Sequence, residues 1–168
     1  WDITRLAGPH KWNWFHLYVI LDVYSRYAVG WLVAPRESDR LAHDLIAACA
    51  TAEQIPTGQL TLHADRGSSM TSRTVAQLLA DLGVTRSHSR PHISNDNPYS
   101  EALLKTEMFH PGFPHIPFES LQEAREWFAG FQRWYNEEHR HSDLKFVTPG
   151  QRHRGEDVAI LEQRSRLY

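Results

Sequence analysis

The chain contains a near-continuous apolar run at residues 15–22, Phe15-His16-Leu17-Tyr18-Val19-Ile20-Leu21-Asp22. A run of this length that does not alternate with polar residues predicts a strand covered on both faces. Residues 27–33 form a second apolar stretch after a tight connection at residues 24–26, so we expect the two strands to pair antiparallel. Residues 1–6 predict a further short strand ahead of this pair.

Beyond residue 33 the spacing of apolar residues changes to that of helices. It predicts amphipathic helices over residues 41–49 and 75–82, with short strands at 59–63 and 84–87. Further helices are expected after residues 97 and 120. The residues expected to cap these helices are Ser38, Thr71 or Ser72, Asn97 followed by Pro98, and Ser120 with Glu123, with Gly83 closing the second helix. The order of elements predicts an α/β fold, a mixed sheet with helices on its faces.

Composition and charge narrow the functional class. The 168 residues fit one soluble domain, with 41% hydrophobic and 23% charged residues and no run long enough to cross a bilayer. Cys49 is the single cysteine, which excludes an intramolecular disulfide and a CxxC-type zinc site. A formal net charge of −2 disfavours a stand-alone DNA-binding module, which is usually strongly basic. A metal-dependent nuclease stays compatible, because its acidic site lowers the net charge.

Three acidic residues lie where a fold could bring them together. Asp65 ends a short strand and opens Asp65-Arg66-Gly67-Ser68-Ser69, where a functional carboxylate and an ordinary turn residue are both plausible. Glu101 falls in the first turn of a helix, where the helix dipole or a pair with Lys105 would also explain it. Asp2 is a polar residue within an apolar strand and says little alone.

The chemistry of phosphodiester bonds gives these acids a common interpretation. Cleavage at neutral pH needs a strong nucleophile and stabilisation of the departing oxygen, and two hard cations can supply both. Such cations take oxygen ligands, above all carboxylates. Two strands and a helix could deliver Asp2, Asp65 and Glu101 to one edge of a mixed sheet, with the 35 residues 66–100 between the last two acids.

Five stretches carry a resemblance to a known family, in this order along the chain. They are Trp1-Asp2-Ile3-Thr4, Leu21-Asp22-Val23-Tyr24-Ser25-Arg26, His63-Ala64-Asp65-Arg66-Gly67-Ser68, Ser94-Asn95-Asp96-Asn97-Pro98-Tyr99-Ser100-Glu101, and Trp134-Tyr135-Asn136 with Arg140-His141 and Thr148-Pro149. With the 35-residue gap, they resemble the DDE transposase and retroviral-integrase superfamily. The integrase core of bacterial insertion-sequence transposases is the most similar group.

The resemblance implies a ribonuclease-H-like fold, a mixed five-stranded sheet flanked by helices. It implies that Asp2, Asp65 and Glu101 hold two Mg²⁺ or Mn²⁺ ions, one activating the attacking hydroxyl and one stabilising the departing oxygen. It also implies that Asp22 is not a ligand, and we assign Asp22 to the turn at residues 24–26. We expect a catalytic core over residues 1–150 and a C-terminal helical tail of the same domain over 151–168.

Basic residues near the acids are candidates for DNA phosphate contacts. These are Arg66, Arg90, His92 and Lys105, and solvated surface charge remains the alternative for each. Relatives commonly carry a basic residue seven positions after the glutamate, whereas this chain has Met108.

The resemblance further implies cleavage and strand transfer on DNA, at transposon ends and a target, by a homo-oligomer in the bacterial cytoplasm. A helix-turn-helix region that reads the ends is expected outside this chain, and no membrane is involved. Two alternatives stay open: a ribonuclease-H-type nuclease without strand transfer, and a catalytically inactive DNA-binding or regulatory remnant.

Overall fold

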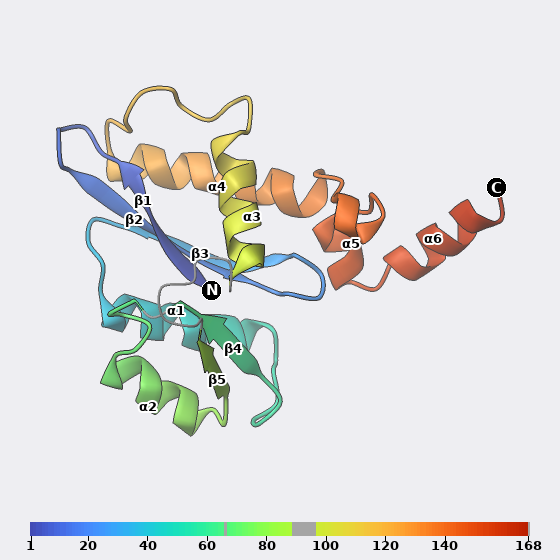
Figure 1. The fold of residues 1–168 in the computed structure, drawn as a ribbon, viewed down its shortest axis with the longest axis horizontal. Coiled ribbons are helices and arrows are strands. Elements are labelled where there is room, and N and C mark those ends of the chain that lie inside the picture. The colour runs from blue at the N-terminus through green and yellow to red at the C-terminus, as the bar shows by residue number, and fades with distance from the viewer. Residues whose placement is uncertain (66, 89–96, 168) are drawn as a thin grey trace.

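The computed structural model describes residues 1–65, 67–88 and 97–167 (Figure 1). Its strands are β1 (Asp2–Ala7), β2 (Trp14–Leu21), β3 (Ala28–Ala34), β4 (Thr61–Ala64) and β5 (Thr85–His88). All five predicted strands are confirmed, with small shifts at their ends. β2 pairs antiparallel with β3, as the sequence predicted, and also with β1, while β4 and β5 pair parallel.

The described strands pair as two sheets, β1-β2-β3 and β4-β5, where the sequence suggested one sheet of five. The reason lies in the bounds of β1 and β4. The backbone nitrogen of Trp1 donates to the carbonyl of His63 over 2.7 Å, near the end of β4. β1 begins at Asp2, one residue after this hydrogen bond. The described strands β1 and β4 therefore approach each other at Trp1 and His63 but do not pair with each other.

The helices cover the three-stranded sheet on both sides (Figure 1). They are α1 (Asp39–Ala52), α2 (Arg73–Asp81), α3 (Pro98–Met108), α4 (Leu121–Glu137), the short 3₁₀ helix η2 (Ser142–Leu144), α5 (Pro149–His153) and α6 (Asp157–Ser165). α3 and α4 lie on one side of the sheet, and α1 lies on the other with β4, β5 and α2. α6 projects away from the body at the C-terminal end. In the described part of the chain, no helix is long and apolar enough to cross a membrane.

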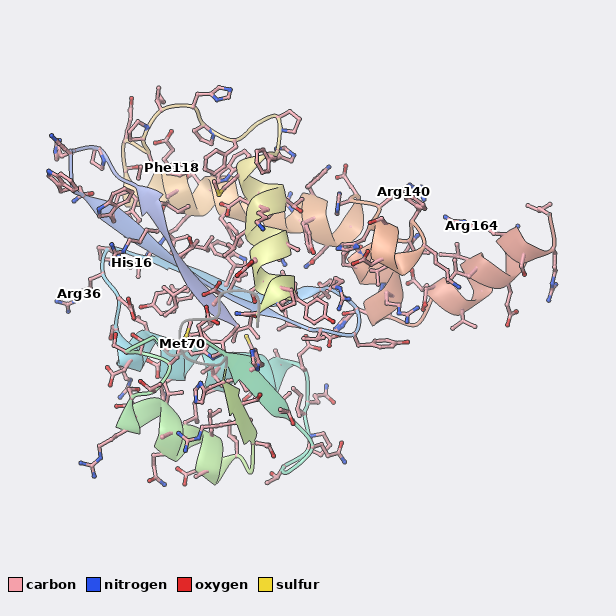
Figure 2. All side chains as sticks on the ribbon, in the orientation of Figure 1. His16, Arg36, Met70, Phe118, Arg140 and Arg164 are labelled. Carbon is pink, nitrogen blue, oxygen red and sulfur yellow. The ribbon has the colours of Figure 1, made fainter. Side chains whose placement is uncertain are left out.

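The apolar run in β2 separates two hydrophobic clusters. Alternate side chains of a strand point to opposite faces, so β2 contributes to both. The α4-side cluster includes Phe15, Leu17, Val19, Leu21, Leu103, Phe118, Ala124, Phe128 and Phe131. The α1-side cluster includes Trp1, Tyr18, Ile20, Ala42, Ile46, Cys49, Ala64, Met70, Val75 and Leu79. Phe118 and Met70 mark the two sides in Figure 2.

All four predicted residues occupy N-cap positions, and two of them make a side-chain capping bond. The Ser72 and Ser120 hydroxyls accept hydrogen bonds from the first turns of α2 and α4. Ser38 and Asn97 occupy the N-cap positions of α1 and α3, but their side chains make no capping bond to the described helix residues. The Asn97 side chain has a tertiary partner, the carbonyl of Trp1, which competes with the capping geometry. Gly83 takes the predicted left-handed conformation after α2, with φ of 65°.

Candidate active site

Asp2 is placed by the pairing of β1 with β2. It lies opposite Val19, a fully buried residue at the centre of the sheet. Its Oδ1 accepts a hydrogen bond of 2.8 Å from the backbone nitrogen of Ile3, and the residue is half-buried. The strand that carries Asp2 is therefore held by backbone bonds on one side and by the packed core beneath it.

Asp65 directly follows β4, whose last residue, Ala64, is buried in the α1-side cluster. The loop beyond Asp65 is tied down by Glu37, which accepts hydrogen bonds from the hydroxyls of Ser69 (2.7 Å) and Ser68 (3.3 Å). The Ser69 hydrogen bond is the main cause that holds the pKa of Glu37 below its ordinary value. The sequence offered no signal for Glu37, which lies in an exposed loop far from Asp65 along the chain.

Glu101 lies in the first turn of α3, as predicted. Asn97 at the start of this helix donates through its Nδ2 to the carbonyl of Trp1 over 3.3 Å. Leu103, two residues after Glu101, is fully buried in the α4-side cluster. The Nζ of Lys105 lies 3.9 Å from Glu101 Oε2, and the lysine side chain is exposed. The pairing with Lys105, which the sequence offered as a structural explanation of Glu101, is thus present.

Trp1 joins the three segments that carry the acids. It precedes Asp2, its nitrogen donates to His63 two residues before Asp65, and its carbonyl accepts from Asn97 four residues before Glu101. Burial raises the pKa of Asp2 to about 6, and the charges of Asp65 and Glu101 both add to the rise. The three residues are half-buried, and Asp2 lies within electrostatic range of both Asp65 and Glu101.

Asp2, Asp65 and Glu101 lie in neighbouring segments but do not form a complete set of metal ligands. Among the residues that the structure describes, no three His, Cys, Asp or Glu side chains are gathered closely enough to hold an ion as they stand. Lys105 is the one predicted phosphate contact in the described chain, and Arg66, Arg90 and His92 lie outside it. Met108 is 61% exposed at the end of α3.

Asp22 has the structural role that was predicted for it. Its carboxylate accepts hydrogen bonds from the backbone nitrogens of Tyr24 (3.2 Å) and Ser25 (3.1 Å) and from the Ser25 hydroxyl (2.5 Å). His153 of α5 lies 3.5 Å from the same carboxylate and bonds to Glu53 at the end of α1. The β2–β3 turn is thus rigid and anchored to the C-terminal part of the chain.

A fourth acidic residue, Glu107, lies on the buried side of α3. It is 1% exposed, and its Oε1 has no hydrogen-bond partner within the described residues. Burial raises the pKa of Glu107 from 4.5 to about 7. An ionised carboxylate in this position would be costly, so the folded state favours the protonated form.

Glu107 is expected to make the protein less stable as the pH rises from 4.5 to 7. Over this window the unfolded chain has released the proton while the folded chain still binds it, so the stabilisation is complete below the unfolded pKa and is lost through the folded pKa. At pH 8, Glu107→Gln should raise the free energy of unfolding by roughly 3 kcal/mol. Urea unfolding at pH 4.5 and pH 8 measures this.

The control for Glu107 is Glu126→Gln on α4, because Glu126 is exposed. This variant should follow the pH dependence of the parent protein. A Glu107→Gln variant that loses stability with pH as steeply as the parent would show that Glu107 titrates normally in the fold.

Comparison with known proteins identifies the family. A family model described as integrase core domain matches residues 1–94, and a second integrase core domain model matches residues 82–149. The first match covers more than half of the chain, so the chain belongs to the integrase core domain family. The resemblance inferred from the sequence motifs is confirmed.

Relatives within this family are transposases. The chain is 33% identical over 153 residues to the transposase for insertion sequence element IS904 of Lactococcus lactis, covering 88% of this chain and 57% of the relative. It is 28% identical over 153 residues to transposase InsF for insertion sequence IS3A of Escherichia coli, covering 89% of this chain and 51% of the relative. The chain therefore spans little more than half the length of these relatives.

Solved structures with the same fold are retroviral integrase cores. The catalytic core domain of BIV integrase has a TM-score of 0.51 at 15% identity and covers 99% of this chain and 97% of its own. The HTLV-2 integrase catalytic core domain, solved in complex with magnesium, has a TM-score of 0.53 at 16% identity, with coverages of 90% and 92%. At these identities the likeness bears on fold, and it confirms the ribonuclease-H-like class.

Proposed function

We propose that this chain is the catalytic core of a DDE transposase, which cuts and joins DNA strands with Asp2, Asp65 and Glu101 as its acidic triad. The observation that carries the proposal is the junction at Trp1, whose backbone bonds to His63 near Asp65 and to Asn97 near Glu101, next to Asp2 itself. Carboxylates that three distant segments bring to one junction need positive charge nearby to stay ionised together. The transposase relatives support the same function.

The donor set fits hard divalent cations. Carboxylate oxygens are the protein ligands that Mg²⁺ prefers, and Mg²⁺ completes its shell with water and phosphate, so a loosely gathered triad can serve. Asp2, Asp65 and Glu101 would hold two such ions. When bound, the ions supply activation of the attacking hydroxyl and stabilisation of the departing oxygen.

The chain's own contribution is to place the carboxylates and the DNA. β1, the end of β4 and the first turn of α3 present the three acids, and Trp1 joins these segments. Lys105, which extends from the same helix as Glu101, is proposed to contact a DNA phosphate. Arg66, Arg90 and His92 are proposed for the same role. No covalent protein–DNA step is required, so the proposal assigns no serine or tyrosine nucleophile.

Titration with Mn²⁺ alone tests the site without needing the DNA sequence. Calorimetry should detect binding to the parent protein and a loss of affinity in both Asp65→Asn and Glu101→Gln, because each removes a charged oxygen ligand. The matched control is Asp81→Asn, an exposed carboxylate on α2, which should leave affinity unchanged. A parent protein that binds no Mn²⁺, or an Asp65→Asn variant that binds it equally well, would contradict the proposed site.

Strand transfer distinguishes a transposase from a plain nuclease. With pre-cleaved DNA ends, the proposed enzyme should join the free 3′-hydroxyl to a second duplex. We propose that it does so as a homo-oligomer and that a helix-turn-helix region outside this chain selects the ends. Hydrolysis without joining would favour the nuclease, whereas DNA binding without either reaction would favour an inactive remnant, for which Met108 is the motivating residue.

A further inference from the structure

The first turn of α3 depends on tertiary contacts for its position. Its N-cap residue, Asn97, makes no side-chain capping bond to the described helix residues and bonds to Trp1 instead. Residues 97–100 also line a cavity of about 610 Å³ that they share with the β2–β3 turn and α1. One side of this turn therefore lacks the close packing that fixes most helices in place.

Arg26 of the β2–β3 turn supplies a contact to the first turn of α3. Its Cζ lies 3.9 Å from the centre of the Tyr99 ring, which is a cation–π distance. Tyr99 is the second residue of α3 and precedes Glu101 by two positions. The guanidinium thus lies against the helical turn that presents the glutamate.

The β2–β3 turn fixes the Arg26 side chain. Arg26 has a φ of 63°, in the left-handed region that residues other than glycine seldom adopt. Its backbone nitrogen donates to the Asp22 carbonyl over 2.8 Å, and its Nη1 donates to the Val23 carbonyl. The Asp22 carboxylate in turn accepts from the backbone of Tyr24 and Ser25. A strained conformation that is held this firmly invites a functional explanation.

We propose that Arg26 is a positioning residue for Glu101 and acts through the ring of Tyr99; the proposal rests on the proposed transposase function. Arg26 follows the end of β2, and Val19 within β2 pairs with Asp2. The stack therefore ties the helix of Glu101 to the strand that fixes Asp2. The distance between the carboxylates of Asp2 and Glu101 would therefore depend on the position of β2.

Two substitutions test the cation–π contact between Arg26 and Tyr99, each by removing one of the two partners. Arg26→Asn removes the guanidinium with a residue that tolerates left-handed backbone, and Tyr99→Leu removes the ring. Each should raise the Mn²⁺ concentration for half-saturation about three- to tenfold, the fold-change equivalent of one cation–π contact. Each should also lower kcat for DNA cleavage with little change in KM. Tyr99→Phe keeps the ring and should stay within about twofold of the parent protein.

A second cation–π pair in the same turn provides the control. The Cζ of Arg152 lies 4.4 Å from the Tyr24 ring, so Tyr24→Leu breaks a similar stack whose two residues both lie outside α3. This variant should bind Mn²⁺ as the parent does. The double variant Arg26→Asn with Tyr99→Leu should be no weaker than either single variant, because both remove the same contact.

Three results would overturn the positioning role. They are equal losses in Tyr99→Phe and Tyr99→Leu, losses that multiply in the double variant, and an equal loss in Tyr24→Leu. Tyr99 is 39% exposed, so Tyr99→Leu should keep the fold and serve even if Arg26→Asn unfolds, as checked by circular dichroism. An error in the proposed acidic triad would give a different result. In that case Asp65→Asn would bind Mn²⁺ as the parent protein does.

Discussion

Replacing Asp65 with Asn is expected to abolish metal-dependent DNA cleavage, with a loss on the order of 10³-fold, equivalent to roughly 4 kcal/mol of transition-state stabilisation. Asn keeps the size and shape of the side chain but removes the charge that a hard cation needs in its ligand. The end of β4 and the serine–Glu37 contacts beyond it should keep the loop in place. Single-turnover cleavage of an end-labelled duplex in Mg²⁺ and in Mn²⁺ measures the loss.

The control for this loss is the Asp81→Asn variant, which changes the same kind of side chain on the surface of α2. It should cleave at the parent rate. Cleavage by Asp65→Asn at more than about a tenth of the parent rate would mean that this carboxylate is not a ligand needed by the reaction.

Phe128→Ala in α4 is expected to have the largest effect on stability, lowering the free energy of unfolding by about 3–5 kcal/mol. Phe128 is fully buried between α4 and the sheet, and its ring lies 5.2 Å from that of Trp31 and 5.6 Å from that of Phe131. Removing the ring leaves a cavity that these neighbours can only partly fill. The shift in urea midpoint at an unchanged slope measures the cost.

Phe109→Ala is the matched control, because this phenylalanine is 81% exposed at the end of α3. Its effect should stay within about 0.5 kcal/mol. If Phe128→Ala cost as little as Phe109→Ala, the α4-side cluster would not be the rigid core that supports the sheet.

The sequence could predict the features that depend on residues close together along the chain. The apolar run of β2 required cover on both faces, and the two hydrophobic clusters provide that cover through alternate side chains. The placement of Glu101 in the first turn of a helix followed from Pro98, which favours the start of a helix. Asp22 could be assigned to a turn because its short side chain bonds to the backbone two or three residues ahead.

Features that depend on distant segments could not be predicted. Asn97 occupies the predicted N-cap position, but its side chain bonds to the distant carbonyl of Trp1 and makes no capping bond to the described helix residues. The contact of Glu37 with Ser69 and that of Arg26 with Tyr99 join residues more than thirty positions apart, and no local pattern marks either pair. The separation of the strands into two sheets depends on where β1 and β4 meet, which a list of strands does not contain.

The placement of the acids on different layers has a consequence for the molecule as a whole. Asp65 follows a residue of the α1-side cluster, Glu101 shares a helix with Leu103 of the α4-side cluster, and Asp2 lies in the sheet between them. A cation shared by all three would act as a cross-link between halves that are otherwise joined mainly by apolar packing. Binding of this cation would raise the free energy of unfolding by about 2.7 kcal/mol at a free cation concentration one hundred times its Kd. The free energy of unfolding would then rise with the concentration of the free cation.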